Sequence, residues 1–110
     1  MGSEMCIRDR TYIVQWQFPS MEASMKATKT FTDYVKEGSP YDSFEGFKVL
    51  IRVLNPQGAN GWAIVQASDH SKIWQWCQPW SAGFGYEIEV KPVLTDEEFV
   101  AVSDQIETAT

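Results

Sequence analysis

The sequence predicts an α+β fold, a ferredoxin-like βαββαβ antiparallel sheet with two helices on one face and a short additional C-terminal helix. Three observations predict it. Residues 47–67 read FKVLIRVL, NPQGANG and WAIVQA, the pattern of a β-hairpin with Pro, Gly and Asn in its turn. A strand pattern followed by a helix pattern precedes this hairpin, and a helix pattern followed by a strand pattern comes after it. The length of 110 residues suits a single domain.

The first strand and the first helix are predicted over residues 11–18 and 21–37. The strand, TYIVQWQF, alternates between two faces, as a half-buried strand does. Ser20 is the expected N-cap of the helix, and Gly38 is its expected end. The helical stripe that we expect to pack on the sheet is Met21, Met25, Thr28, Phe31, Tyr34 and Val35.

Regular alternation within the hairpin divides its residues between two faces. In the first strand, one face carries Phe47, Val49, Ile51 and Val53. The opposite face carries Lys48, Leu50, Arg52 and Leu54. In the second strand, Trp62, Ile64 and Gln66 alternate with Ala63, Val65 and Ala67.

The second helix is expected to begin after Ser68 or Asp69, either of which can cap it. Its apolar stripe is Ile73, Trp76, Cys77 and Trp80. Because proline in a helix interior costs about 3 kcal/mol, we expect regular helix to stop just before Pro79.

The last strand is predicted over residues 86–93, with Pro92 marking it as an edge strand or a strand end. Thr95 and Glu98 have the spacing of a capping box. They indicate a short amphipathic C-terminal helix with Phe99, Val102 and Ile106 as its apolar positions.

Two right-handed crossovers place both helices on one face of the sheet, and we call the other face the open face. The apolar residues assigned to it are Ile13, Leu50, Leu54, Trp62 and Ile64. A sheet face of this kind generally needs a partner, so we expect a homodimer formed through it. The polar and aromatic binding candidates on the same face are Gln15, Gln17, Arg52, Trp62, Gln66, Glu87 and Glu89.

Composition excludes several classes of partner. The net charge is −6, and Lys and Arg are scattered, so no nucleic acid or anionic membrane is expected to bind. Apolar runs are too short for a membrane span. Two cysteines give no disulfide framework and suit a reducing compartment, so we expect a cytoplasmic protein.

Residues with catalytic potential have ordinary structural explanations. His70 is the only histidine and stands at a helix start, where exposure is expected. Cys77 lies on an apolar stripe, and Glu87 and Glu89 share one strand face, where ion pairs are the simplest interpretation. No metal set and no phosphate-binding glycine motif is evident, so no cofactor is expected. The Trp74, Trp76 and Trp80 cluster is expected to serve packing, with an aromatic wall for a flat ligand as the alternative.

The first ten residues have a separate explanation. Residues 5–10, MCIRDR, correspond to the nucleotide string ATG TGT ATA AGA GAC AG, which resembles a transposase end sequence used in preparing sequencing libraries. We expect residues 1–10 to be an adapter-derived, disordered segment and residues 11–110 to form the single domain.

Three stretches carry a resemblance to a known family: YIVQW near the start, SKIWQWCQPWSA, and YEIEVKPVLTDEEF near the end. With these motifs, residues 11–106 resemble a family of small uncharacterised bacterial proteins in the dimeric α+β barrel superfamily. The resemblance implies a homodimer in which two ferredoxin-like sheets pack face to face.

Two functions are consistent with the sequence, and whether the protein is an enzyme stays open. The first is a small homodimeric binding or interaction module without catalysis of its own. The alternative, suggested by the resemblance, is a cofactor-independent monooxygenase or isomerase acting on a small hydrophobic substrate between the sheet and the helices. An enclosed pocket beside the sheet would favour binding of such a molecule.

Overall fold

The computed structural model describes residues 10–109 and confirms the predicted fold class. Within these residues the chain forms a five-stranded antiparallel sheet of order β2-β3-β4-β1-β5. The strands are β1 (Arg10–Gln17), β2 (Ser43–Phe44), β3 (Phe47–Asn55), β4 (Asn60–Ala67) and β5 (Glu87–Val93). The helices are α2 (Met21–Lys36), α3 (His70–Phe84) and α4 (Asp96–Ala109), with a 3₁₀ turn, η1 (Pro56–Gly58), in the hairpin.

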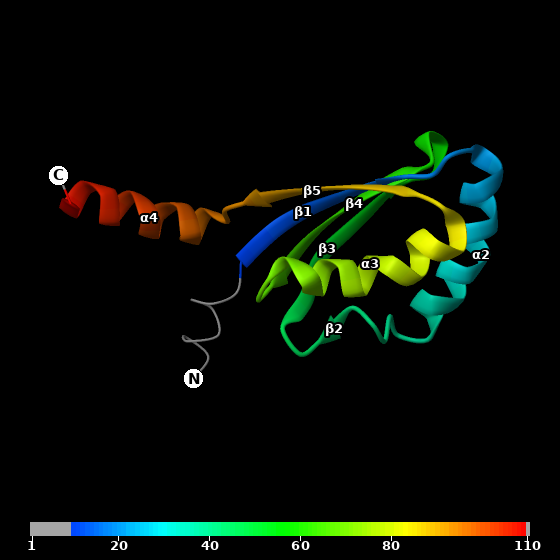
Figure 1. Ribbon diagram of the computed structural model, residues 1–110, viewed down its shortest axis with the longest axis horizontal. Coiled ribbons are helices and arrows are strands. Elements are labelled where there is room, and N and C mark those ends of the chain that lie inside the picture. The colour runs from blue at the N-terminus through cyan, green and yellow to red at the C-terminus, as the bar shows by residue number, and fades with distance from the viewer. Residues whose placement is uncertain (1–9, 110) are drawn as a thin grey trace.

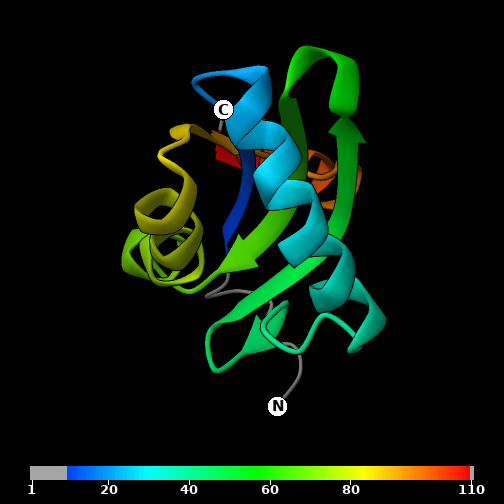
Figure 2. The same ribbon diagram turned by 90° about the vertical axis from the view of Figure 1, so that its right-hand side faces the viewer.

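The helices α2 and α3 both lie on one face of the sheet, as Figures 1 and 2 show, and the core fills the space beneath them. The order β3-β4-β1-β5 is that of a ferredoxin-like sheet, to which the two-residue strand β2 adds an edge. The buried core consists of Tyr12, Val14, Trp16, Phe47, Ala63, Val65, Ala67, Ile73, Trp76 and Cys77.

A β-bulge in β3 corrects the predicted alternation. Val49 pairs with Val65 and Ile51 pairs with Ile64, so Leu50 is the extra residue. Because one inserted residue exchanges the two faces, everything after Leu50 is reversed from the expectation. The side chains of Ile51 and Val53 are 56% and 50% exposed on the open face, whereas Arg52 points toward the helices. The predicted positions of Ile51, Arg52, Val53 and Leu54 were therefore wrong.

The predicted cap of α2 is confirmed, but its inner stripe is displaced. Ser20 accepts a hydrogen bond from the amide of Ala23 at 3.1 Å, which satisfies one of the first helical donors. The buried residues of the helix are Ser24 and Ala27, while Met21 and Met25 are exposed. Small side chains, not the methionines, therefore face the sheet.

Helix α3 begins at the predicted cap, since Asp69 accepts a hydrogen bond from the amide of Ser71. It continues past Pro79 to Phe84, so the predicted end was wrong. Pro79 lies on the exposed side of the helix, where water can solvate the carbonyl that loses its amide partner. The αL residue Gly85 ends the helix.

Helix α4 projects beyond the end of β5, away from the rest of the domain (Figure 1). The predicted capping box is confirmed: the Thr95 amide donates to Glu98 Oε1 at 2.8 Å, and the Glu98 amide donates to Thr95 Oγ1 at 3.1 Å. No residue of Asp96–Ala109 is buried, although the sequence of this 14-residue helix is amphipathic.

No helix within residues 10–109 has the length and apolar character needed to cross a membrane. The interpretation of the first ten residues as adapter-derived falls on residues 1–9, outside the described residues, and on Arg10, which is the first residue of β1.

Candidate functional site

A cleft of about 550 Å³ lies between α2, α3 and the helix-covered face of the sheet. This volume is in the range of small-molecule sites, which span roughly 300–1,000 Å³. Seven aromatic side chains line it: Trp16, Phe18, Phe31, Tyr34, Trp76, Trp80 and Tyr86. The cleft is therefore suited to an apolar, flat molecule.

Small residues on α2 keep this space open. Ser24, Ala27 and Thr28 line the cleft, and none of them has a side chain large enough to reach across it. On the sheet, Gly61 allows Trp16 to lie flat against β4, because a Cβ at Gly61 would come within 2.5 Å of Trp16 Cζ2. The cleft is thus the volume between the small side chains of α2 and the Trp16 ring, which lies on the sheet.

Trp80 organises the aromatic wall contributed by the helices. Its ring centroid lies 6.0 Å from Phe31, 5.8 Å from Tyr34 and 5.7 Å from Phe84. The contacts to Phe31 and Tyr34 are edge-to-face, the geometry favoured by aromatic quadrupoles. The prediction that Trp76 and Trp80 share the inner stripe while Trp74 points elsewhere is confirmed, since Trp74 is 56% exposed.

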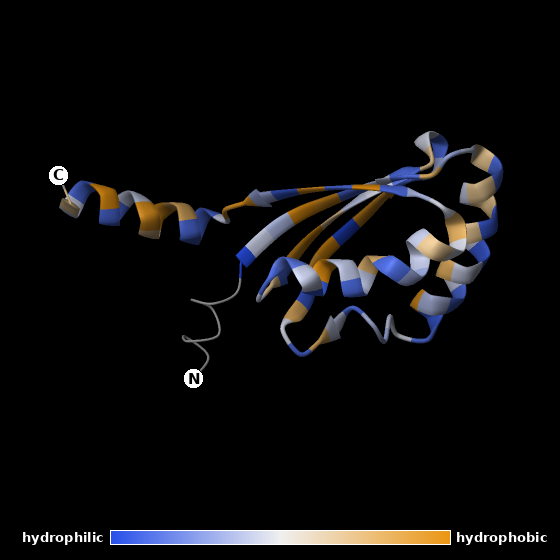
Figure 3. Ribbon diagram, viewed as in Figure 1, coloured by the Kyte–Doolittle hydropathy of each residue, from blue (hydrophilic) through white to orange (hydrophobic). Residues whose placement is uncertain are grey.

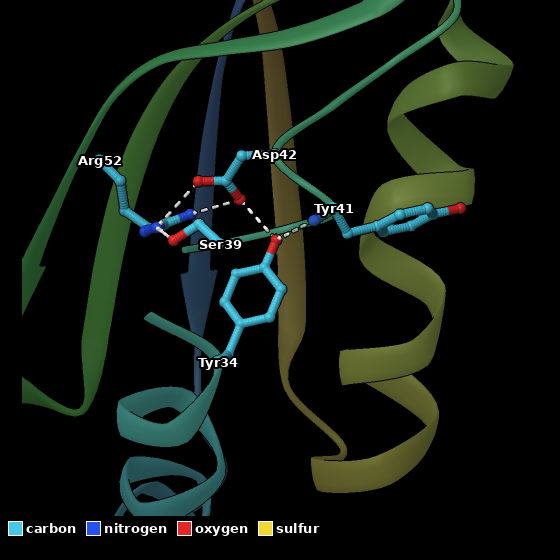
Figure 4. Close-up of polar contacts among 5 residues, drawn as sticks. All are labelled: Tyr34, Ser39, Tyr41, Asp42 and Arg52. Atoms are coloured by element: carbon cyan, nitrogen blue, oxygen red, sulfur yellow. Dashed lines mark hydrogen bonds and ion pairs between the residues drawn. The ribbon is translucent and has the colours of Figure 1, made fainter. Parts of the chain in front are cut away.

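Tyr34 and Arg52, which line the cleft, belong to a polar cluster whose contacts are drawn in Figure 4. The Arg52 guanidinium binds the Asp42 carboxylate through two contacts of 3.0 Å. Tyr34 Oη donates to Asp42 Oδ1 at 2.7 Å and accepts the Tyr41 amide at 3.0 Å. Arg52 Nη2 also donates to Ser39 Oγ at 3.4 Å. These bonds tie the end of α2 and the following connector to β3.

The charge of Arg52 is compensated inside this cluster. Its side chain and that of Asp42 are only 15% and 22% exposed, and the guanidinium carbon sits 4.9 Å above the Phe31 ring. Burial, together with the hydrogen bond to Asp42, raises the pKa of Tyr34 well above its ordinary value. The phenol therefore stays protonated and neutral at physiological pH.

The partly buried Tyr86 and the buried Cys77 form a second polar pair, in hydrogen-bond contact with each other. Burial raises the pKa of the Cys77 thiol to about 12, and it also raises the pKa of the Tyr86 phenol above its ordinary value. Neither group is a nucleophile or a general base at neutral pH. The expectation that Cys77 belongs to the core is confirmed, with 2% of the residue exposed.

The structure divides the predicted binding residues between two faces. Four of them meet at one end of the open face, because Gln15 pairs with Glu89 and Gln17 with Glu87. Trp62 lies beside Gln15, and Gln66 lies beside Thr11. Arg52 is the exception: the bulge moves it to the cleft on the opposite face, which corrects its prediction as an open-face residue.

Gln17 has a structural partner. Its Nε2 donates to the carbonyl oxygens of Gly58 at 2.9 Å and Ala59 at 3.2 Å. It therefore fixes the hairpin loop to the end of β1, a role that the alternation pattern did not reveal.

His70 is exposed at the start of α3, as predicted, with its ring 6.2 Å from that of Tyr12. Among residues 10–109, no group of three or more His, Cys, Asp or Glu side chains is placed to hold a metal ion.

Sequence reasoning missed Asp42, Tyr34 and Ser24 as site residues. Asp42 lies in a connector whose conformation no periodic pattern defines. Tyr34 was assigned to core packing, and Ser24 was passed over because the bulkier methionines beside it fit a helical stripe equally well. The absence of bulk at Ser24 and Ala27 was the one available signal.

Searches among curated proteins and among solved structures gave no significant match. Residues 10–107, nearly the whole chain, match a family described as a domain of unknown function, DUF3303. This protein, with its aromatic cleft and protruding C-terminal helix, belongs to the DUF3303 family.

Proposed function

We propose that this domain is a binding module for a small, flat, hydrophobic molecule. The observation that carries the proposal is the cleft of about 550 Å³, which seven aromatic side chains line. Stacking on Trp80 and Trp16 would supply affinity, because aromatic side chains bury large areas and prefer flat partners. Thr28 and Thr32 also line the cleft, and their hydroxyls would meet the polar end of such a ligand; that of Thr28 would act as an acceptor, because it donates to the Ser24 carbonyl oxygen at 2.9 Å.

The residues that line the cleft fit ligand binding better than they fit catalysis of a reaction. Proton abstraction, as in a cofactor-independent monooxygenase or isomerase, needs a base whose pKa is near the working pH. In the described lining, Tyr34 and Tyr86 hold their protons, and Arg52 is paired with Asp42. The described lining contains no His, Asp or Glu side chain, and its one further titratable group is Lys36.

The test is titration with a fluorescent naphthalene probe, 1-anilinonaphthalene-8-sulfonate, against wild-type protein and two variants. Ser24→Leu adds bulk inside the cleft, and we expect it to reduce the probe's apparent affinity at least tenfold. Met25→Leu is the matched control, since Met25 is 68% exposed on the adjacent position of the same helix. Equal binding by all three proteins, at unchanged circular dichroism, would contradict the proposal.

We also propose that the domain is a homodimer formed through its open face. The support is an apolar patch consisting of Ile13, Ile51, Val53, Trp62 and Ile64, which the pairing of β1, β3 and β4 brings together. Ile51 is 56% exposed and Val53 is 50% exposed. Monomeric proteins rarely expose such residues in one contiguous apolar patch. The resemblance to the dimeric α+β barrel superfamily points the same way.

Sedimentation velocity at micromolar concentration tests this. We expect a dimer for the wild type and a monomer for Ile51→Lys. Trp74→Lys is the control, because Trp74 is equally exposed, at 56%, but lies on α3. A monomeric wild type would overturn the proposed dimer. It would not affect the ligand-binding proposal, which the probe titration tests separately.

A further inference from the structure

The C-terminal helix carries an apolar stripe that lies outside the body of the domain. Phe99 is 61% exposed, Val102 40% and Ile106 60%. Figure 3 shows these apolar segments on a helix that extends past the sheet into solvent. An amphipathic helix gains most of its stability from packing its apolar face, so its sequence indicates a surface that receives it.

The stripe points to the same side of the molecule as the open face. Thr11 stands on that face and donates its hydroxyl to both carboxylate oxygens of Glu98 at 3.0 Å, which fixes the rotation of the first turn of α4. With 3.6 residues per turn, Val102 lies about 40° around the helix axis from Glu98, and Phe99 lies about 100° from it. Val102 is therefore turned toward the side on which Thr11 is found, and Phe99 lies about a quarter turn around the axis from Glu98.

The helix is not placed to cover its own sheet. The β1–β5 ladder extends to the pair of Thr11 and Val93, and only Leu94 and Thr95 separate β5 from α4. Because this connection continues the direction of β5, α4 leads away from the patch (Figure 1). The capping box and the Thr11–Glu98 bonds hold the junction in that direction.

The two surfaces match in size and in charge. A helix of 14 residues is about 21 Å long, enough to cross three strands that together span roughly 14 Å. The helix carries Asp96, Glu97, Glu98, Asp104 and Glu107 and no basic residue. On the open face, Lys48 on β3 and Lys91 on β5 border the patch toward the end of the sheet nearest α4, while Glu87 and Glu89 lie toward the opposite end, beside Gln17 and Gln15. The acidic helix is therefore favoured at the lysine end of the face.

We propose that α4 of one copy packs across the open face of a second copy, in a reciprocal exchange. This rests on the proposed homodimer and states which element meets the sheet: a helix of the partner chain, where the superfamily resemblance implies the partner's sheet. Phe99 and Val102 contact the patch around Ile51, Val53 and Trp62. Two-fold symmetry repeats the contact, so each α4 is buried once and each open face is covered once.

Charge insertion on the helix tests the exchange. We expect Phe99→Glu combined with Val102→Glu to be monomeric in sedimentation velocity at concentrations where the wild type is a dimer. Val100→Glu is the control, since Val100 is 56% exposed on the same helix but lies about 200° around the axis from Glu98. A dimer that survives the double substitution yet is lost with Ile51→Lys would overturn the exchange and favour sheet-to-sheet packing.

Crosslinking gives a second readout that does not depend on dimer stability. In a Cys6→Ser background, one chain carries Val102→Cys and a differently tagged chain carries Val53→Cys; Cys77 is buried. A short bismaleimide should link the two tags in mixed samples at least tenfold more than when Val100→Cys replaces Val102→Cys. Equal yields from the two positions would overturn the proposal, and a monomeric wild type would remove the homodimer on which it rests.

Discussion

Gly61 and Trp16 illustrate how one residue without a side chain shapes the cleft. Trp16 lies over the β4 backbone at Gly61, and a Cβ there would sit 2.5 Å and 2.8 Å from two indole carbons and 3.0 Å from the Val53 carbonyl oxygen. Real Cβ atoms do not approach that closely, so the indole would have to move into the cleft. The sequence offered Gly61 only as a turn residue, because its packing role depends on a cross-strand neighbour.

We expect Gly61→Ala to lower the free energy of unfolding by about 1–3 kcal/mol, the usual cost of overpacking. Urea denaturation followed by tryptophan fluorescence measures it. Gly83→Ala is the control: it lies in α3 with nothing within 4 Å of the added Cβ, so it should be neutral or stabilise by up to about 1 kcal/mol. A Gly61→Ala protein as stable as the wild type would show that Trp16 does not lie against β4.

The Cys77–Tyr86 pair predicts a loss of stability in alkali. The native pKa of Cys77 is about 12 while the unfolded thiol titrates near 9, so between these values the unfolded chain has released a proton that the native chain keeps. Stability is therefore complete below pH 9 and falls above it, by about 1.4 kcal/mol per pH unit for one such proton.

Replacing the thiol isolates this contribution. We expect the unfolding free energy of Cys77→Ala to fall less steeply between pH 9.5 and 11 than that of the wild type. The difference in slope should be about 1.4 kcal/mol per pH unit, the value for one proton. Because the comparison uses the slopes of unfolding free energy against pH, the pH-independent cost of the cavity that Cys77→Ala creates does not affect it. Parallel pH profiles would mean that the thiol titrates alike in the folded and unfolded chains.

At the scale of elements, the predictable features were those with a local chemical signature. Ser20, Asp69 and the Thr95–Glu98 box were read directly, because each cap satisfies helix donors with its own side chain. The strand order also followed from the alternation of helix and strand patterns.

The bulge was not predictable in this way. In residues 49–54 the odd-numbered and the even-numbered positions are both apolar, except for Arg52. A shift of one residue in strand register therefore leaves each face of the strand almost equally hydrophobic. What decides the register is tertiary: the pairing of Arg52 with Asp42 and its contact with Phe31 beneath α2. The open-face set differed from expectation for this reason, and the cleft set differed also because Ser24 and Ala27 of α2, not its methionines, face the sheet.

Deleting Leu50 tests the bulge. Since Val49 already pairs with Val65 and Ile51 with Ile64, removing the extra residue leaves a regular ladder with Arg52 on the same side. We expect a cooperatively folded protein destabilised by less than about 2 kcal/mol, because only local twist is lost. Deleting Ile64 instead should abolish cooperative unfolding, since it reverses half of β4. If the Leu50 deletion is the more damaging, the strand has no bulge there.

At the scale of the whole molecule, the domain has two apolar surfaces on opposite faces of its sheet. The cleft lies on the helix-covered side of the sheet, and the patch of Ile13, Ile51, Val53, Trp62 and Ile64 lies on the other. The sheet between them has aliphatic and aromatic side chains on both faces, which suits a sheet buried on both sides. A principal extent of 54 Å against 27 and 21 Å reflects a helix that is well formed yet apart from the body.

This shape predicts that thermal stability depends on protein concentration. If a second copy covers the open face only in the folded state, mass action stabilises the native dimer, and the melting temperature rises with concentration. We expect a rise of several degrees between 2 and 200 μM for the wild type, measured by circular dichroism at 222 nm, and no rise for Phe99→Glu with Val102→Glu. A melting temperature that is independent of concentration in the wild type would mean that α4 and the open face are solvated in the native protein.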